Sequence, residues 1–411
     1  MPYIKQILSN GLPVYYDPVS EARSAAVGVW VRAGSRFETK LEAGMTHFLE
    51  HMCFKGTPTR TAQDIANEMD FLGGEINAFT SQEMTCFYAH ILSENAERAA
   101  ATLGDLLRRS IFDAEELSRE KGVVIEEIAE SQDDPEDLVV QQLYEAHFGT
   151  HPLALPILGT ELSVSSFSRK DIQHYFQKHY HRGSMFATVS GRVRWPSFLA
   201  SLEESFSSLS PVPSEKEGDL PVCEPVFQKR STFRELEQVH VAMGMTGLPT
   251  NHDDQTALRL LNLHLGGGMS SRLFQEVREK RGLAYSIYST RQSFRDGGLV
   301  RISASTRPSK KEELVKILTE ELDRLKHVPL TDDELARAKN QIKSSLLIGL
   351  ESILTRMNKM GKDLLYWGEE LEPETIEKWI DESSPLDLQR IARDRDWVSN
   401  HSLSILGPEK E

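Results

Sequence analysis

Residues 44–57 read Gly-Met-Thr-His-Phe-Leu-Glu-His-Met-Cys-Phe-Lys-Gly-Thr, a pattern typical of a helix. His47 and His51 are four residues apart, so they lie on one helix face, one turn from each other. That spacing allows two imidazoles to bind one Zn²⁺. Glu50 borders the same face, where a carboxylate can take a proton from a metal-activated water. We therefore predict an inverted His-x-x-Glu-His zinc motif; the competing interpretation is scattered polar residues on an ordinary amphipathic surface helix.

A catalytic zinc normally has three protein ligands and one open position, so a third ligand must lie elsewhere in the chain. The segment 112–130 begins with Asp113-x-x-Glu116, a plausible capping box, and has a helical pattern. Its spacing alone leaves the choice of ligand open among four carboxylates, Glu120, Glu126, Glu127 and Glu130.

Composition excludes several classes of protein. The formal net charge of -15 argues against nucleic acid or an anionic membrane as the main partner, because both repel an acidic surface. The three cysteines have no C-x-x-C spacing, which favours a reducing compartment. The N-terminus lacks a secretory pattern, and no apolar stretch approaches the ~20 residues that span a bilayer. We expect a cytoplasmic protein.

The 411 residues suggest more than one domain, and the chain divides near its middle. Residues 208–225 are rich in proline, serine and charge, as is typical of an exposed linker. Ser168-x-x-Asp171 recurs as Ser384-x-x-Asp387, and the strand-like run 185–191 recurs as 401–407. Both pairs are offset by 216 residues, which indicates a duplication. We predict a first domain over 1–212, a linker over 213–230, and a second domain over 231–411.

Each half reads as α+β. Asn10-Gly11 between apolar runs predicts a hairpin. Because hairpins dominate, we expect two duplicated domains, each a largely antiparallel or mixed sheet with helices packed on one side. The expected strands are 25–33, 75–80, 84–92, 239–245 and two within 284–304, and the expected helices are 44–55, 61–72, 94–110, 114–131, 251–265, 270–280 and several within 309–394.

Four motifs together resemble one family, the pitrilysin and mitochondrial processing peptidase family of inverted-motif zinc peptidases. They are His47-Phe-Leu-Glu-His-Met-x-Phe-Lys-Gly-Thr57, Gly73-Gly-x-x-Asn-Ala-Phe-Thr-Ser81, Glu120-Lys-Gly-Val-Val-Ile-Glu-Glu-Ile128 and His151-Pro-Leu-x-x-Pro-Ile-Leu-Gly-Thr160. The resemblance covers essentially the whole chain and implies one zinc ion per chain. It also implies that Glu127 is the third ligand and that Glu120 hydrogen-bonds the site.

In the second half, the resemblance implies that Arg278 and Tyr285 reach the zinc site, bind substrate and stabilise the oxyanion. It further implies that a peptide adds as a strand beside Asn77, Ala78 and Phe79. The expected activity is zinc-dependent endopeptidase cleavage of short or unfolded peptides, by a homodimer that encloses a chamber. The alternative is a catalytically silent scaffold or binding subunit. Such members typically lose motif residues, whereas all are intact here.

Overall fold

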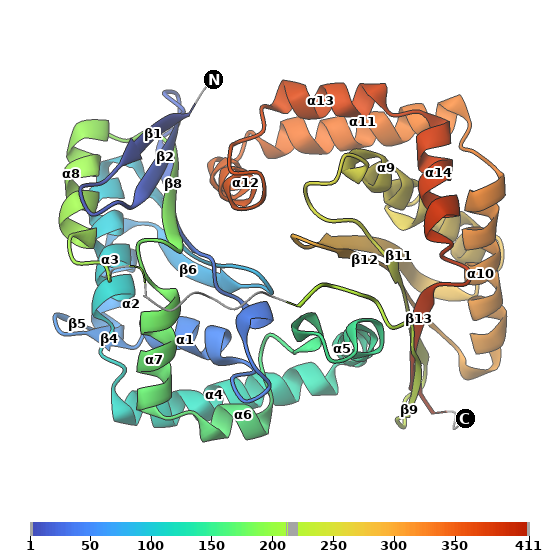
Figure 1. Cartoon of the computed structure of the whole chain (residues 1–411), viewed down its shortest axis with the longest axis horizontal. Coiled ribbons are helices and arrows are strands. Elements are labelled where there is room, and N and C mark those ends of the chain that lie inside the picture. Colours follow the sequence, from blue (N-terminus) through green and yellow to red (C-terminus); the bar gives the residue numbers. More distant parts are fainter. Residues whose placement is uncertain (1–2, 211, 213–220, 409–411) are drawn as a thin grey trace. The chain divides into compact units, whose positions relative to one another are not determined.

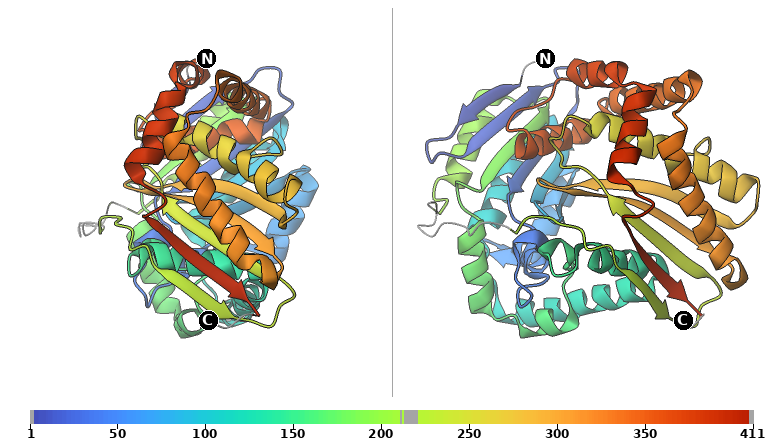
Figure 2. Two further views of the ribbon diagram at one scale, coloured as in Figure 1. Left: turned by 90° about the vertical axis from the view of Figure 1, so that its right-hand side faces the viewer. Right: turned by 45° about the vertical axis from the view of Figure 1, so that its right-hand side comes forward.

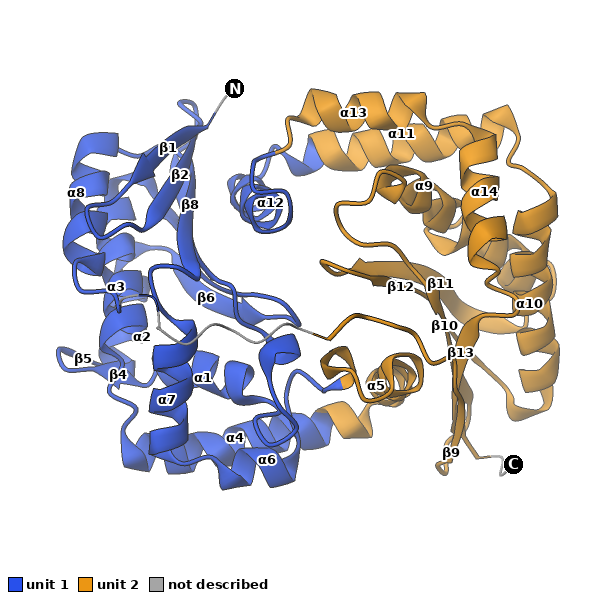
Figure 3. Ribbon diagram, in the orientation of Figure 1, with its two compact units in different colours: residues 1–130, 155–220, 348–370 blue, residues 131–154, 221–347, 371–411 orange. Residues whose placement is uncertain are grey.

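The computed structural model describes residues 3–210, 212 and 221–408. The chain forms two compact units (Figure 3). Unit 1 comprises Met1–Glu130, Leu155–Leu220 and Ile348–Glu370; unit 2 comprises Ser131–Ala154, Pro221–Leu347 and Leu371–Glu411.

Unit 1 is built on a six-stranded sheet with strand order β1-β2-β8-β3-β7-β6 (Figure 1). The predicted hairpin at Asn10-Gly11 joins β1 to β2, and Gly11 has a φ of 93°, which glycine adopts readily. Every pairing is antiparallel except β2 with β8. The strands are β1 (Ile4–Ile7), β2 (Pro13–Pro18), β3 (Ser24–Val31), β6 (Glu75–Thr80), β7 (Thr85–Leu92) and β8 (Met185–Gly191), with a small separate ribbon of β4 (Gly56–Thr57) and β5 (Arg60–Thr61).

Helices cover both faces of this sheet. On one face, β-branched and aromatic residues of β2, β3 and β7 pack with α1, α3, α7 and α8. On the other, Trp30 and Phe186 pack with Met357 and Met360 of α12. The expectation of helices on one side only is therefore wrong. The physical reason is that apolar side chains project from both faces of these strands, and β8 is buried at every position, so helices must pack on both faces. The helical segments of this part are η1 (Ser35–Phe37), α1 (Met45–Cys53), α2 (Ala62–Leu72), η2 (Ser93–Asn95), α3 (Ala96–Arg109), α4 (Ala114–Asp133), α6 (Glu161–Ser166), α7 (Arg169–His179), α8 (Trp195–Phe206) and α12 (Ile353–Tyr366).

Two contacts attach α12 to the sheet. The Arg356 guanidinium binds the buried Asp17 carboxylate at both oxygens, at 2.6 and 2.7 Å. One turn further along, Gly361 lies directly against the Trp30 indole, where a Cβ atom would be only 2.0 Å from Cε2. α12 therefore depends on a charged pair and on the absence of a side chain at residue 361.

Unit 2 repeats the plan with a five-stranded sheet of order β11-β12-β10-β13-β9. One face packs with α9, α10 and α14, and Figure 2 shows α10 and α14 side by side. The other face packs with α5. The elements are α5 (Pro135–Phe148), η3 (Pro152–Ala154), β9 (Lys229–Phe233), β10 (Val239–Thr246), α9 (Gln255–Gly266), η4 (Phe274–Glu279), β11 (Ala284–Ser293), β12 (Gly298–Thr306), η5 (Pro308–Lys310), α10 (Lys311–His327), α11 (Asp332–Gly349), α13 (Pro373–Glu382), α14 (Pro385–Arg395) and β13 (His401–Gly407).

The repeat read from the sequence has a structural counterpart in each unit. The side chains of Ser168 and Ser384 each accept a hydrogen bond from the backbone N–H of the aspartate three residues on. Each aspartate carboxylate accepts one from the backbone N–H of its serine, so both are capping boxes. The strand-like runs of the repeat form β8 and β13, and both strands lie inside their sheets.

The two compact units do not correspond to the first and second halves of the sequence. α5, from the first half, belongs to unit 2, and α12, from the second half, belongs to unit 1. Of the predicted linker 213–230, residues 213–220 lie outside the described residues, and Lys229 already begins β9. Within the described part of the chain, none of the helices has the length and apolar character needed to cross a bilayer.

Candidate zinc site

The helix α1 presents its polar face to the site because its other face is held in the core. Phe48, Leu49 and Met52 are fully buried there. The buried Glu38 carboxylate accepts hydrogen bonds from the backbone N–H groups of Gly44 and Thr46, at 2.8 and 2.7 Å. A carboxylate suits this position, because the first N–H groups of a helix have no partner within it.

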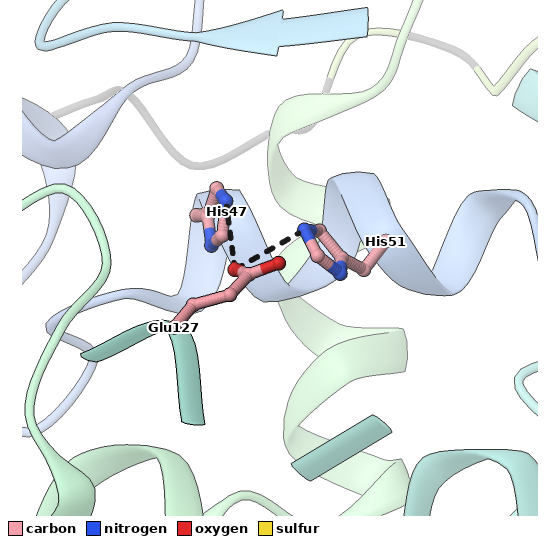
Figure 4. Close-up of side chains that lie close together, drawn as sticks. All are labelled: His47, His51 and Glu127. Carbon is pink, nitrogen blue, oxygen red and sulfur yellow. Dashed lines mark ion pairs between the residues drawn. The ribbon is translucent and has the colours of Figure 1, made fainter. Parts of the chain in front are cut away.

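His47, His51 and Glu127 converge on one point from two helices, α1 and α4 (Figure 4). Glu127 Oε2 lies 3.9 Å from His47 Nε2 and 3.7 Å from His51 Nε2. Two ligands of a tetrahedral zinc with bonds of 2.0–2.1 Å would be about 3.4 Å apart, so a small inward shift completes the geometry. Burial and the neighbouring His51 lower the pKa of His47 to about 4, which keeps its imidazole neutral and able to bind a metal. Two imidazoles and one carboxylate are the donor set of a catalytic zinc site.

Glu120 orients the His51 imidazole by contacting the ring nitrogen that lies away from Glu127. Its Oε1 lies 2.8 Å from His51 Nδ1, which leaves Nε2 directed toward Glu127. Its other oxygen is 2.6 Å from Lys55 Nζ. Burial alone would raise the pKa of Glu120, but the hydrogen bonds from His51 and Lys55 lower it overall. Sequence reasoning missed Lys55; its position one turn after His51 on the motif helix was the available signal.

Glu50 is the predicted base, and it is buried beside the two histidines. Burial raises the pKa of its carboxyl, although a hydrogen bond from Thr80 opposes the rise. The Thr80 hydroxyl donates to Glu50 Oε2. Sequence reasoning placed Thr80 in the substrate strand without giving it a role, because a contact between residues 30 positions apart has no local signal.

Asn77, Ala78 and Phe79 lie on β6, the last strand of the sheet. Among the residues that the structure describes, β6 pairs with β7 alone, so its other edge is open, as the sequence predicted for this segment. Phe79 is anchored edge-on against Trp30 at 5.8 Å, whereas Asn77 is exposed. Their part in substrate binding stays a prediction.

Arg278 and Tyr285 lie together in unit 2, apart in sequence from the zinc ligands of unit 1. The Arg278 guanidinium carbon is 4.6 Å from the centre of the Tyr285 ring and 4.7 Å from that of Phe274, which is typical of a cation–π arrangement. Tyr285 is 80% exposed, unusual for a phenol in a strand. The predicted reach of this pair to the zinc site stays a prediction.

Comparisons with known proteins agree with this arrangement. The family model described as "Insulinase (Peptidase family M16)" matches residues 15–161, and "Peptidase M16 inactive domain" matches residues 166–342. An uncharacterized zinc protease of Streptomyces coelicolor is 38% identical over 98% of this chain and 89% of its own length. The uncharacterized zinc protease YmxG of Bacillus subtilis is 39% identical over 97% of each chain.

Solved structures share the fold. A protease from Helicobacter pylori has a TM-score of 0.90 at 22% identity, over 99% of each chain. A Pseudomonas fluorescens structure described as a peptidase M16 inactive domain has a TM-score of 0.91 at 20% identity, over 100% of this chain and 99% of that one. With two relatives above 35% identity along nearly the full length, the chain belongs to peptidase family M16, the insulinase family.

Proposed function

We propose that this protein is a zinc-dependent endopeptidase that cleaves short or unfolded peptides. The observation that carries the proposal is the convergence of His47, His51 and Glu127, with the buried Glu50 on the same helix. The relatives named above are described as zinc proteases, which supports a peptidase with a zinc cofactor.

The residues of the site have separate roles in metal binding, proton transfer and positioning. His47, His51 and Glu127 would hold the ion, and zinc bound there would supply a Lewis acid that lowers the pKa of water. Glu50 accepts the proton of the attacking water and returns it to the leaving amine. Burial suits this role, because it raises the pKa of the carboxyl and so strengthens it as a base. Thr80 holds one oxygen of Glu50 and so fixes the direction of the other.

One variant of the base and one matched pair of variants of the ligand test the assignment. Glu50→Gln should keep zinc, measured by metal analysis, and abolish cleavage of an internally quenched peptide. Glu127→Gln should lose zinc, whereas Glu126→Gln, at the exposed neighbouring position on α4, should retain both zinc and activity. Normal cleavage by Glu50→Gln would refute the base, and zinc retained by Glu127→Gln would refute the ligand.

Substrate recognition follows from the open edge of β6. An extended peptide that adds to β6 is bound through its backbone, which tolerates many sequences but requires an unfolded or short chain. N-methylation of successive peptide bonds in one substrate should block cleavage at alternate positions, because only alternate N–H groups face the neighbouring strand. Equal sensitivity at every position would contradict strand addition.

The predicted homodimer is part of the proposal, since the chain carries both the metal motif and the Arg278–Tyr285 pair and needs no different subunit. A fully active monomer in sedimentation analysis would contradict it. A cytoplasmic location is also proposed; it is supported by the lack of C-x-x-C spacing among the three cysteines, which favours a reducing compartment. The alternative, a silent scaffold subunit, predicts zinc binding without any cleavage in the presence or absence of chelator.

A further inference from the structure

Unit 2 contains a cavity of about 210 Å³ beside Arg301. Its lining comes from α5 and from the neighbouring strands β11 and β12, and comprises Tyr144, Thr290, Arg291, Gln292, Leu299 and Arg301. A volume of this size exceeds the ~10–15 Å³ that one water needs and falls below the ~300 Å³ of drug-sized sites. It therefore suits a small ligand or ion, not a peptide.

Arg301 is the central group of this cavity. Its Nε atom is buried and has no hydrogen-bond partner among the described residues. Arg301 is half-buried, and its guanidinium presents five N–H donors in a fixed fork. Across residues 3–210, 212 and 221–408, no carboxylate forms an ion pair with Arg301. The Nε–H group of Arg301 can therefore donate a hydrogen bond to an oxygen of a bound ligand.

Arg301 lies directly opposite Thr290 of β11 in the sheet register, so both side chains leave the sheet on the face that packs with α5. The side chain of Arg291, the next residue of β11, leaves on the other face, where its Nη1 donates to Gln255 Oε1 of α9 at 3.1 Å. The guanidinium that faces the cavity is therefore that of Arg301.

The remaining wall carries no negative charge. Burial raises the pKa of Tyr144 to about 12, so its hydroxyl stays protonated, and it donates to Gln292. Thr290 adds a hydroxyl, and Leu299 forms an apolar floor.

We infer that this cavity binds a small oxyanion, a phosphate or a carboxylate, through the guanidinium of Arg301, with the hydroxyl of Thr290 beside it. Both anions offer the planar or forked pair of oxygens that an arginine binds with two parallel hydrogen bonds. The inference concerns unit 2 and is independent of the proposed peptidase chemistry.

Calorimetric titration of the full chain with inorganic phosphate, and separately with acetate, tests the inference at constant ionic strength. Wild type and Arg307→Gln, which removes an exposed arginine just beyond β12, should bind equally. Arg301→Gln should weaken binding at least tenfold, and Thr290→Val by a smaller factor. The stronger of the two anions identifies the class of ligand.

Three outcomes would overturn the inference: no binding to wild type at millimolar anion, equal binding to Arg301→Gln, or binding that survives Arg301→Gln but is lost in Glu127→Gln. The last would place the anion on zinc. If Arg301→Gln does not fold by circular dichroism, Arg301→Lys replaces it. This variant keeps the positive charge but loses the planar set of guanidinium N–H donors. It should therefore bind the anion at least threefold more weakly than wild type.

Discussion

The contact between α12 and Trp30 allows a prediction whose sign and size both follow from the structure. Gly361→Ala places a Cβ atom 2.0 Å from Cε2 and 2.1 Å from Cζ2 of Trp30, where ordinary contact begins at 3.4 Å. The indole has little freedom to move, because it is fully buried, stacks on Phe186 and donates from Nε1 to the Thr188 hydroxyl at 2.7 Å.

Overpacking of a core costs about 1–3 kcal/mol, and the severe overlap puts this substitution at the upper end. Alanine recovers about 1 kcal/mol relative to glycine within a helix. Gly361→Ala should therefore lower the free energy of unfolding of unit 1 by about 2 kcal/mol.

Gly122→Ala is the matched control, because it makes the same change inside α4, where a new Cβ meets nothing within 4 Å. It should raise stability by up to about 1 kcal/mol. Urea denaturation followed by far-ultraviolet circular dichroism measures both variants against wild type. Equal effects of the two variants, or a stabilising Gly361→Ala, would refute the packing of α12 against Trp30.

The other predictions concern the site and its supports. Glu120→Gln should weaken zinc affinity about 10- to 100-fold by releasing His51, as measured by competition with a chelating dye; unchanged affinity would contradict the orienting role. Thr80→Val should lower kcat with little change in KM, and Thr80→Ser should restore it, because only the hydroxyl holds Glu50; equal rates for the two variants would exclude this hydrogen bond as the cause. Burial raises the pKa of Glu38 to about 7, above its ordinary value of 4.5, so the folded state holds a proton that the unfolded state releases. This contribution to stability is present below pH 4.5 and is lost as the pH rises through about 7, by roughly 3 kcal/mol. In chelator-treated protein, Glu38→Gln should therefore abolish that part of the decline, and urea midpoints that fall in parallel for the variant and wild type would argue against it.

The sequence alone was sufficient for the features that depend on a few neighbouring residues. The pairing of His47 and His51 follows from the helical repeat, and α1 forms over the predicted segment. The strand Glu75–Thr80 was likewise predicted over the residues that form it, and the recurring Ser-x-x-Asp pattern lies at the start of α7 and α14, because these signals depend on a few neighbouring residues.

Only the tertiary structure decided which groups from distant segments meet. Helical spacing left four carboxylates of α4 open, and the family resemblance pointed to Glu127 and Glu120. Their contacts exist only because α4 packs against α1, which brings Glu127 to both histidines and Glu120 to Nδ1 of His51. The same holds for the exchange of α5 and α12 between the units, since an apolar sheet face specifies that it must be covered but not by which helix. Local periodicity is encoded within a few residues of sequence, whereas long-range partners are selected by shape and charge once the chain has folded.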